Sequence, residues 1–403
     1  MSELLTPKLR FPKFDDNWST HNLSEISEQI KRKKEDISSE DNILTISANK
    51  GFISQKERWD NVIAGGSLKK YTYLKQNEFS YNRGNSKSFK FGCIYKLNNY
   101  KNALVPNVYH SFKITYGNTD FFEQLFKSKI LDKQLIKMIT STARMDGLLN
   151  ISAKNFFNIN VNFPNDLKEQ EKIGSFLKTI DTKIILLEQK YDNYLNFKKY
   201  LMQQIFTQKL RFKHYDDDWK ETKIGNIAEV VGGGTPKTEI DSYWNGDIKW
   251  YTPSEIGKTK YIDDSERHIT EEGLKNSSAK LLPKNTILLS SRATVGEVSI
   301  TLTECSTNQG FQSLITKNNV DNEFIYYLIS TIKNEFLKRS SGSTFLEISR
   351  NEIKKIKINI PSLNEQKLIG NVLSDIDKKI FYLENRINKT QEFKRGLLQQ
   401  MFI

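Results

Sequence analysis

Two segments of the chain place apolar residues at alternating spacings of three and four. The first segment runs from Ile173 to Ile205 and the second from Ile369 to Met401. This is the a/d spacing of a coiled-coil helix. A proline stands upstream of each segment, at Pro164 and Pro361. The pattern therefore predicts two long helices of about 38 residues, or about 57 Å each.

One lysine interrupts the apolar seam of each predicted helix, Lys198 in the first and Lys394 in the second. A polar seam residue costs stability, but it can fix the register or leave a site for another chain. The simplest arrangement packs the two helices against each other, antiparallel and related by an approximate two-fold axis. The predicted seam residues are Ile173, Leu177, Ile180, Ile184, Leu187, Ile369, Leu373, Ile376, Ile380 and Leu383.

The helices are part of a longer duplication. The segments Glu169 to Glu188 and Glu365 to Glu384 share 11 of 20 residues, and they lie 196 positions apart. A leader, KLRFPKFDDNW at Lys8 to Trp18, returns as KLRFKHYDDDW at Lys209 to Trp219. An apolar strand ending at Pro164 likewise returns before Pro361. Two copies of one order of elements predict a duplicated domain pair and not a solenoid.

Between the leader and the closing strand, each copy reads as mixed strand, turn and short helix. Residues 121–139 and 322–339 are predicted helices, and NILTIS and FGCIYKL are predicted strands. The expected fold class is α+β: two similar mixed α/β recognition domains separated by two long helices packed as an antiparallel coiled coil. The predicted boundaries are 1–160 for domain one, 161–207 for helix one, 208–358 for domain two and 359–403 for helix two.

Charge points to a polyanionic partner. The chain has 61 Lys and Arg against 48 Asp and Glu, a net charge of +13. Such an excess in a folded protein most often marks nucleic-acid binding. For any one residue, an ordinary solvated surface side chain is an equally good interpretation. The candidate DNA-contacting residues are Lys50, Lys56, Arg58, Lys69, Lys70, Arg83, Lys87, Arg144, Thr235, Lys237, Lys249, Tyr251, Lys258, Lys260, Arg292, Asn308, Gln309, Ser343 and Thr344.

The sequence argues against a disulfide-bonded protein, a membrane protein, a P-loop nucleotide site and a metal site. Two distant cysteines favour a reducing compartment over a disulfide framework, and no apolar run is long enough to span a bilayer. The chain is therefore expected to be cytoplasmic, with no membrane partner. GGGTPKT at 232–238 lacks P-loop spacing and reads as a glycine-rich turn entering a strand. The four histidines are scattered, so no metal site is predicted.

A nuclease-like carboxylate set is the weaker interpretation of three charged residues on the first helix. Asp181, Glu188 and Lys190 could form such a set, and Asp377, Glu384 and Arg386 are their counterparts. Because they lie on a predicted coiled-coil helix, a solvated face with ion pairs explains them better. No catalytic, cofactor-binding or metal-binding residue is predicted for this chain.

Taken together, these motifs resemble the specificity subunits of type I restriction-modification systems. The resemblance is carried by the two leaders, the two EQ…IG…L..ID.KI..LE helices and their QQ-F ends. GGGTPKT, SSRATVGEV and TNQGFQSL in domain two also resemble that family's recognition domains. The resemblance covers essentially the whole chain and is weaker in the loops of domain one.

The resemblance implies a protein without catalysis of its own. Each recognition domain would read one half of a bipartite, asymmetric double-stranded DNA target. The paired helices would set the gap between the halves and, through their seam residues, dock two methyltransferase (M) subunits. Those subunits would use AdoMet to methylate adenine, and restriction (R) subunits would use ATP and Mg²⁺. Two alternatives stay open: a self-sufficient DNA methyltransferase or nuclease, and a coiled-coil adaptor unrelated to DNA.

Overall fold

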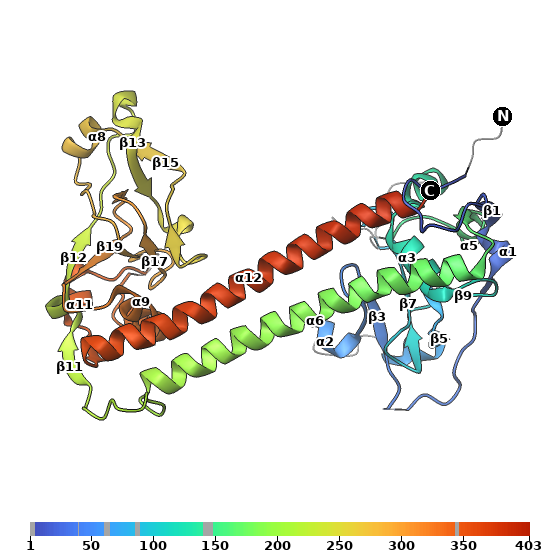
Figure 1. The fold of residues 1–403 in the computed structure, drawn as a ribbon, viewed down its shortest axis with the longest axis horizontal. Coiled ribbons are helices and arrows are strands. Elements are labelled where there is room, and N and C mark those ends of the chain that lie inside the picture. Colours follow the sequence, from blue (N-terminus) through green and yellow to red (C-terminus); the bar gives the residue numbers. More distant parts are fainter. Residues whose placement is uncertain (1–4, 39, 60–64, 85–88, 140–147, 343–345) are drawn as a thin grey trace. The chain divides into compact units, whose positions relative to one another are not determined.

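The computed structural model describes residues 5–38, 40–59, 65–84, 89–139, 148–342 and 346–403 (Figure 1). The chain divides into two compact units: a first unit, Met1–Glu188 with Asn385–Ile403, and a second unit, Gln189–Glu384. Both boundaries fall inside long helices, α6 (Leu167–Phe206) and α12 (Leu363–Met401). The prediction of two long helices is confirmed, and each unit contains a part of both. The four predicted domain boundaries stay a prediction.

The first unit is built on a four-stranded antiparallel sheet in the order β2-β9-β6-β7 and two antiparallel ribbons, β3-β4 and β5-β8. Phe79, Tyr81, Phe112 and Phe156 form the aromatic centre of its core. The strands are β2 (Ser27–Gln29), β3 (Leu44–Ser47), β4 (Gly51–Ser54), β5 (Thr72–Lys75), β6 (Phe79–Asn82), β7 (Cys93–Lys96), β8 (Asn102–Val105) and β9 (His110–Ile114). The short helices are α1 (Leu23–Ile26), α2 (Gln55–Trp59), η1 (Gly65–Lys70), α3 (Thr119–Lys127), α4 (Asp132–Met138) and α5 (Ala153–Phe157).

The second unit contains a five-stranded sheet in the order β12-β19-β16-β17-β14 and a three-stranded sheet in the order β15-β13-β18. The strands are β12 (Ala228–Gly232), β13 (Trp244–Tyr251), β14 (Tyr261–Ile262), β15 (Arg267–Ile269), β16 (Ile287–Leu289), β17 (Val298–Thr301), β18 (Ser306–Thr307) and β19 (Gln312–Thr316). The helices are α7 (Ile224–Ile227), η2 (Asp241–Tyr243), η3 (Pro253–Glu255), α8 (Glu271–Lys275), α9 (Asn322–Thr331), α10 (Lys333–Lys338) and α11 (Arg350–Lys355). The mixture of helix and sheet in both units confirms the predicted α+β class.

A two-stranded antiparallel ribbon closes each unit. The leader of the first unit continues into β1 (Ser19–Asn22), which pairs with β10 (Asn160–Phe163). In the second unit β11 (Lys220–Lys223) pairs with β20 (Lys357–Ile360). The closing strands end directly before Pro164 and Pro361, as predicted. Because Pro has no N–H to continue a ladder, each ribbon stops there and the chain turns into a long helix.

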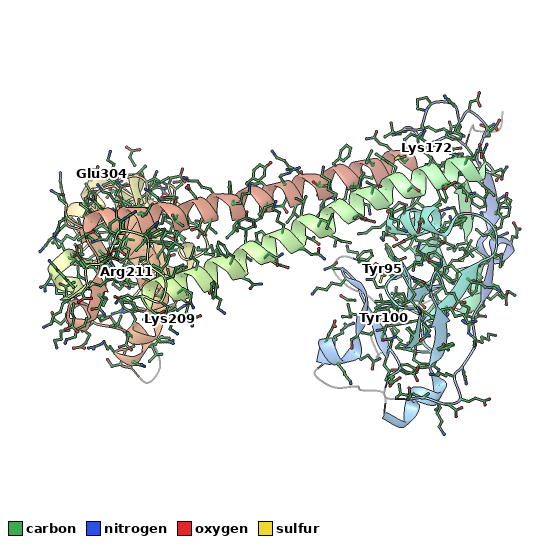
Figure 2. The ribbon with its side chains drawn as sticks, turned by 60° about the horizontal axis from the view of Figure 1, so that its bottom comes forward. Tyr95, Tyr100, Lys172, Lys209, Arg211 and Glu304 are labelled. Carbon is green, nitrogen blue, oxygen red and sulfur yellow. The ribbon has the colours of Figure 1, made fainter. Side chains whose placement is uncertain are left out.

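In each unit, an arginine of the repeated leader forms an ion pair with the repeated glutamate of the long helix. Nε and Nη2 of Arg10 each donate to one carboxylate oxygen of Glu169 at 2.7 Å, and the Glu169 side chain is 1% exposed. Arg211, labelled in Figure 2 beyond the end of α6, binds Glu365 in the same way at 3.2 and 2.9 Å. Bidentate pairs of this kind fix direction as well as distance. They anchor each leader to the first turn of the long helix that begins in the same unit, α6 in the first unit and α12 in the second.

The glutamine that follows each glutamate hydrogen-bonds two backbone groups outside the long helix. The Oε1 of Gln170 accepts from the backbone N–H of Asn118 at 2.8 Å, and its Nε2 donates to the carbonyl of Pro164 at 2.7 Å. Gln366 makes the equivalent bonds to Asp321 at 3.0 Å and Pro361 at 2.9 Å. Both amides therefore satisfy backbone groups of two other segments in the interior. The Glu-Gln pair is repeated because each unit needs the same junction.

The leaders also contact the ends of the long helices. The N–H of Leu210 donates to the carbonyl of Gln204 at 3.1 Å, where the chain passes directly from α6 into its second leader. In the first unit the N–H of Leu9 donates to the carbonyl of Gln400 at 2.9 Å. In the second unit this bond joins residues six positions apart in the sequence. In the first unit the equivalent bond joins residues near the two ends of the chain.

Two predicted helices are each broken in the structure. Residues 121–139 form α3 and α4, and the residues between them include Lys129 with φ +63°. Residues 322–339 form α9 and α10, interrupted at Ile332. Both first helices begin at a capping side chain, Asn118 or Asp321, whose oxygen accepts from the N–H three residues later. The single-helix prediction was wrong because periodicity does not reveal a one-residue change of backbone conformation.

Candidate nucleic-acid interface and helix pair

The seams of α6 and α12 contribute to a hydrophobic core in each unit. In the first unit the N-terminal part of α6, including Leu177, packs with Phe121 of α3 and Met401 of α12. In the second unit the N-terminal part of α12, including Leu373, packs with Phe324 of α9. All predicted seam residues are at most 9% exposed except Leu187, which is half-buried. The start of one helix thus lies in each unit with the end of the other, which makes the pairing antiparallel.

The lysine in each seam meets an aspartate of the opposite helix. In the first unit Lys394 of α12 is ion-paired with Asp181 of α6, and its side chain is 10% exposed. In the second unit the Nζ of Lys198 lies 2.6 Å from Asp377 Oδ1. Asp181 and Asp377 are 196 positions apart, as are the two lysines. One ion pair is therefore built twice, with the roles of the two helices exchanged.

Each of these aspartates is also held by the domain packed beside it. Asp181 accepts from Gln124 Nε2 at 2.9 Å and from Lys127 Nζ at 3.2 Å, both on α3. Asp377 accepts from the hydroxyl of Tyr327 on α9 at 2.6 Å. The expectation of a solvated face is wrong for both aspartates, although the expected ion pairs are present. Each aspartate links both long helices to the domain packed beside them.

Burial and charge oppose each other at Asp181. Burial raises the pKa of this carboxyl, but the ammonium groups of Lys127 and Lys394 and the Gln124 hydrogen bond outweigh it, so its pKa lies below the ordinary value. Burial lowers the pKa of Lys394, and Asp181 offsets part of that effect. Each charge is tolerated in the interior because its partner is present.

In the second unit a fixed loop carries several predicted contacts. The glycine-rich segment 232–238 follows strand β12, whose last residue is Gly232, so the predicted turn entering a strand is instead a loop leaving one. A Cβ at Gly233 would lie 2.1 Å from the carbonyl oxygen of Asn308, so only glycine fits. Trp250 Nε1 donates to the carbonyl of Gly234 at 2.9 Å. The loop holds Lys237 exposed on a fixed backbone.

The same loop brings Thr235 and Gln309 together. The hydroxyl of Thr235 donates to Gln309 Oε1 at 2.5 Å, and Gln309 is exposed. Asn308 is half-buried, and its Oδ1 accepts from the N–H of Gly310 at 2.8 Å. Its side chain therefore supports the turn. Gln309 and Lys237 stay available at the surface, and so does Lys258, which is exposed after η3.

Burial removes other predicted contacts from the candidate interface. Tyr251 is fully buried and packs with Ile256 and Leu282, so it cannot touch DNA. Lys260 is 8% exposed, ion-paired with Glu323 and hydrogen-bonded to Ser374, and burial lowers its pKa to about 8. These two predictions were wrong because residue type and loop position do not reveal burial.

Lys249 and Arg83 are occupied within the fold. Lys249 donates to the carbonyl of Asp263 and, at 3.0 Å, to the hydroxyl of Thr303. Arg83 is half-buried, and its Nε donates to the carbonyl of Val108 at 3.0 Å. Both side chains therefore tie segments of their own units together. The sequence alone does not distinguish a lysine or arginine that bonds within its own unit from one that is available to bind DNA.

The remaining candidates of the first unit lie at exposed positions. Lys50 lies in the turn between β3 and β4, and Lys56 and Arg58 lie on α2, which follows β4. Lys69 and Lys70 lie on η1. Arg58 also donates to the carbonyl of Ile46 at 3.2 Å.

Four of the predicted candidates lie outside the described residues: Lys87, Arg144, Ser343 and Thr344. Within the part of the chain that the structure describes, no group of three or more His, Cys, Asp and Glu side chains is placed to hold a metal ion. In the same part, no helix is both long and apolar enough to cross a membrane.

Sequence reasoning missed several residues that the structure makes important. The carboxylates that receive a seam lysine were seen only as surface charges, and Glu347, which is paired with Arg292, was not singled out at all. The duplicated Glu-Gln pair was recognised as part of a repeat, but its anchoring role in each unit was not predicted. Glu347 gives no comparable signal, since its partner lies far away in the sequence.

Comparison with known proteins finds a family model and several relatives to which this chain is similar. Residues 216–392 match the family model described as "Type I restriction modification DNA specificity domain". The MjaIX specificity subunit of Methanocaldococcus jannaschii is 43% identical over 189 residues, which cover 46% of this chain and 43% of that protein. The EcoR124I/EcoR124II specificity subunit of Escherichia coli is 29% identical over 221 residues, 53% of this chain and 54% of that protein. The aligned part of the chain thus spans about half the length of these curated relatives.

The fold is shared over nearly the full chain. The S subunit of a type I restriction-modification system from M. genitalium superposes with a TM-score of 0.64 at 16% identity, covering 99% of both chains. A chain solved in work on complex assembly of a type I system gives a TM-score of 0.56 at 14% identity. The resemblance to type I specificity subunits is confirmed.

Replacing Asp181 by Asn should lower the free energy of unfolding by about 2 kcal/mol, because Lys394 and Lys127 lose a charged partner in a partly buried site. Denaturant unfolding followed by circular dichroism measures this. The loss should shrink as the pH falls below about 4, where a carboxyl with a lowered pKa also becomes protonated and its stabilisation disappears.

Asp375→Asn is the matched control. Asp375 pairs with Lys378 on α12, but its side chain is 71% exposed. It should change stability by less than about 0.5 kcal/mol. Equal effects of the two variants would contradict the assigned role of Asp181.

Proposed function

We propose that this protein is the DNA-recognition subunit of a type I restriction-modification complex. The proposal rests on the specificity domain at residues 216–392 and on the second copy of its framework in the first unit. Each unit reads one half of an asymmetric, bipartite double-stranded DNA target. The chain contributes recognition, and its partner subunits contribute methylation and cleavage.

The duplication supports the reading of two different half-sites. The anchoring bonds of Gln170 and Gln366 are the same in both units, whereas the sheets and loops they support differ. A shared frame with unlike loops is expected where two domains bind different sequences. The exposed cations of both units supply charge for the phosphates, and the net charge of +13 favours DNA over a neutral partner.

The helices support a role in spacing. α6 and α12 have 40 and 39 residues, or about 60 Å each, and each runs without interruption through the boundary between the units. An element of that length can hold two DNA-binding domains at sites about one or more helical turns apart. The length of the helix pair would therefore determine the unread gap.

The outer faces of the helices support docking of two equivalent partners, whereas the predicted seam residues are too buried to receive one. Phe197 on α6 and Phe393 on α12 stand at the same repeat position and are 49% and 58% exposed. Ile185 with Phe381, and Leu186 with Tyr382, form two more such pairs. Large exposed apolar side chains that recur in both copies fit one partner bound twice. We assign the partner as the M subunit, with AdoMet bound by M and ATP and Mg²⁺ used by R, all in the cytoplasm.

Adenine methylome sequencing tests the proposed function. The chain and the M subunit of its own system are expressed separately and together in a host without adenine methylation. Together they should modify one split motif, and neither should do so alone. A motif modified by this chain alone would establish a self-sufficient methyltransferase. An active M subunit whose motif is the same with and without this chain would contradict the proposal.

Phe197→Glu should release one of two M subunits, because it places a charge on one docking face only. Mass photometry of the purified assembly should then show one M subunit for each chain, and Phe197→Glu with Phe393→Glu should show none. Leu302→Glu, at a residue that is 47% exposed in the second unit outside the helices, is the control and should retain both. Two M subunits on the double variant would show that these faces are not the docking sites.

A further inference from the structure

Residues 290–297, between β16 and β17, form a closed loop with an exposed tip. Ser290 ties its two ends: its Oγ hydrogen-bonds the carbonyl of Thr294 and accepts from the N–H of Glu297 at 3.1 Å. Its own carbonyl accepts from the N–H of Gly296 at 3.0 Å. Ser290 is fully buried, so the base of the loop is fixed within the unit.

The tip of this loop is strained. Ala293 has φ +59°, in the left-handed region that a residue with a Cβ rarely adopts. Its neighbours Arg292 and Thr294 are exposed, as is Ala293 itself. A conformation of this kind persists where the surroundings determine it, and such positions gather at functional sites. Here the consequence is geometric, because the strained residue holds Arg292 outward at a fixed place.

A second segment fixes the Arg292 side chain. Glu347 forms an isolated antiparallel bridge with Arg292 and another with Ser341, with backbone bonds of 2.9 and 3.0 Å between Ser341 and Glu347. The next residue, Ile348, donates to the carbonyl of Ser291 at 3.0 Å. From this position the Glu347 carboxylate reaches Arg292, with Nε 2.9 Å from Oε1. The side chains are 44% and 40% exposed, so the pair lies at the surface.

The pairing leaves a defined set of donors. Arg has five N–H groups in a planar fork, and the nitrogen nearest the chain, Nε, lies 2.9 Å from Glu347 Oε1. Within the described residues, no other ion pair or hydrogen bond of the Arg292 side chain is recorded. The two terminal nitrogens therefore present a pair of donors, end-on, in a plane that Glu347 restricts.

Charge decides which DNA group suits this fork. A phosphate attracts an uncompensated cation, but the carboxylate of Glu347 cancels most of the charge of Arg292 and would repel a phosphate nearby. A base edge is neutral, so it gains the hydrogen bonds without that repulsion. Two exposed lysines of this unit, Lys237 and Lys258, form no ion pair within the described residues and suit phosphates better.

Guanine is the base whose major-groove edge offers two adjacent acceptors, O6 and N7. Adenine offers N7 beside an amino donor, and cytosine offers an amino donor, so neither can receive both N–H groups of the fork. Because the proposed function assigns one half-site to this unit, we propose that Arg292, positioned by Glu347, reads a guanine in the half-site of the second unit. Arg292 is the specificity-determining residue and Glu347 is a positioning residue.

The wild-type methylome gives the first test. If the proposed function holds, the protein yields a split motif, and the half-site of the second unit must contain a defined G·C pair. A split motif without any defined G·C pair in either half would overturn the assignment of guanine while leaving the proposed function intact. The absence of any split motif would count against the proposed function itself.

The second test uses binding of the assembled complex to duplexes that carry each base pair at that position. Arg292→Ala should reduce discrimination for the one G·C pair by about 5- to 150-fold and leave the other half-site unchanged. Arg292→Lys, which keeps the charge and the fold, should also lose discrimination, because Lys lacks the planar fork. Glu347→Ala should relax the same position less strongly, and Glu347→Gln, whose amide oxygen still accepts from Nε, should restore most of it.

Salt dependence separates a base contact from a phosphate contact. For Arg292→Ala, the slope of log K against log salt should stay near the wild-type value. For Lys258→Ala, the control, it should fall by about one while affinity drops uniformly across sequences. If Arg292→Ala behaves like Lys258→Ala, Arg292 binds phosphate and the proposal is overturned. Thermal melts of each variant check that the fold is retained.

Discussion

The pairing of a lysine in the seam of one helix with an aspartate of the other is the interaction on which the rest of the structure depends. A cation placed alone between apolar helices would be expelled, and a carboxylate would be expelled as readily. Lys394 with Asp181, and Lys198 with Asp377, satisfy each other only when the start of one helix meets the end of its partner. The ion pairs therefore specify an antiparallel register in each unit, which apolar residues alone specify less sharply.

The same aspartates connect the helices to the domain of each unit. Gln124 and Tyr327 reach them from α3 and α9, the helices whose first turns are anchored by Gln170 and Gln366. A displaced long helix would thus lose its partner helix and its domain together. This arrangement gives a physical reason for the duplication: the frame must be identical in both units, while the loops that it supports are free to differ.

Much of this frame could be predicted from the sequence, because periodicity and repetition are visible in one dimension. The heptads predicted α6 and α12, and the copied leaders and strands predicted the duplicated framework. What could not be predicted depends on tertiary contacts. Lys129 and Ile332 break helices that periodicity joins, the burial of Tyr251 and of the Lys260 side chain does not follow from residue type, and Glu347 meets Arg292 only after folding. Candidate contacts were therefore predicted less well than the elements that carry them.

Lengthening the helix pair tests the central claim most directly. Seven residues copied from 182–188 are inserted after Glu188, and the equivalent seven, 378–384, after Glu384, so that both seams and their antiparallel pairing are kept. The insertion adds about 10 Å, the rise of about three base pairs. About three base pairs is the largest change expected in the gap. Because the two half-sites also rotate about the DNA axis as the gap grows, a smaller change also fits. Adenine methylome sequencing should show both half-sites unchanged and the gap between them lengthened by up to about three base pairs. Retained methylation with an unchanged gap would contradict the account.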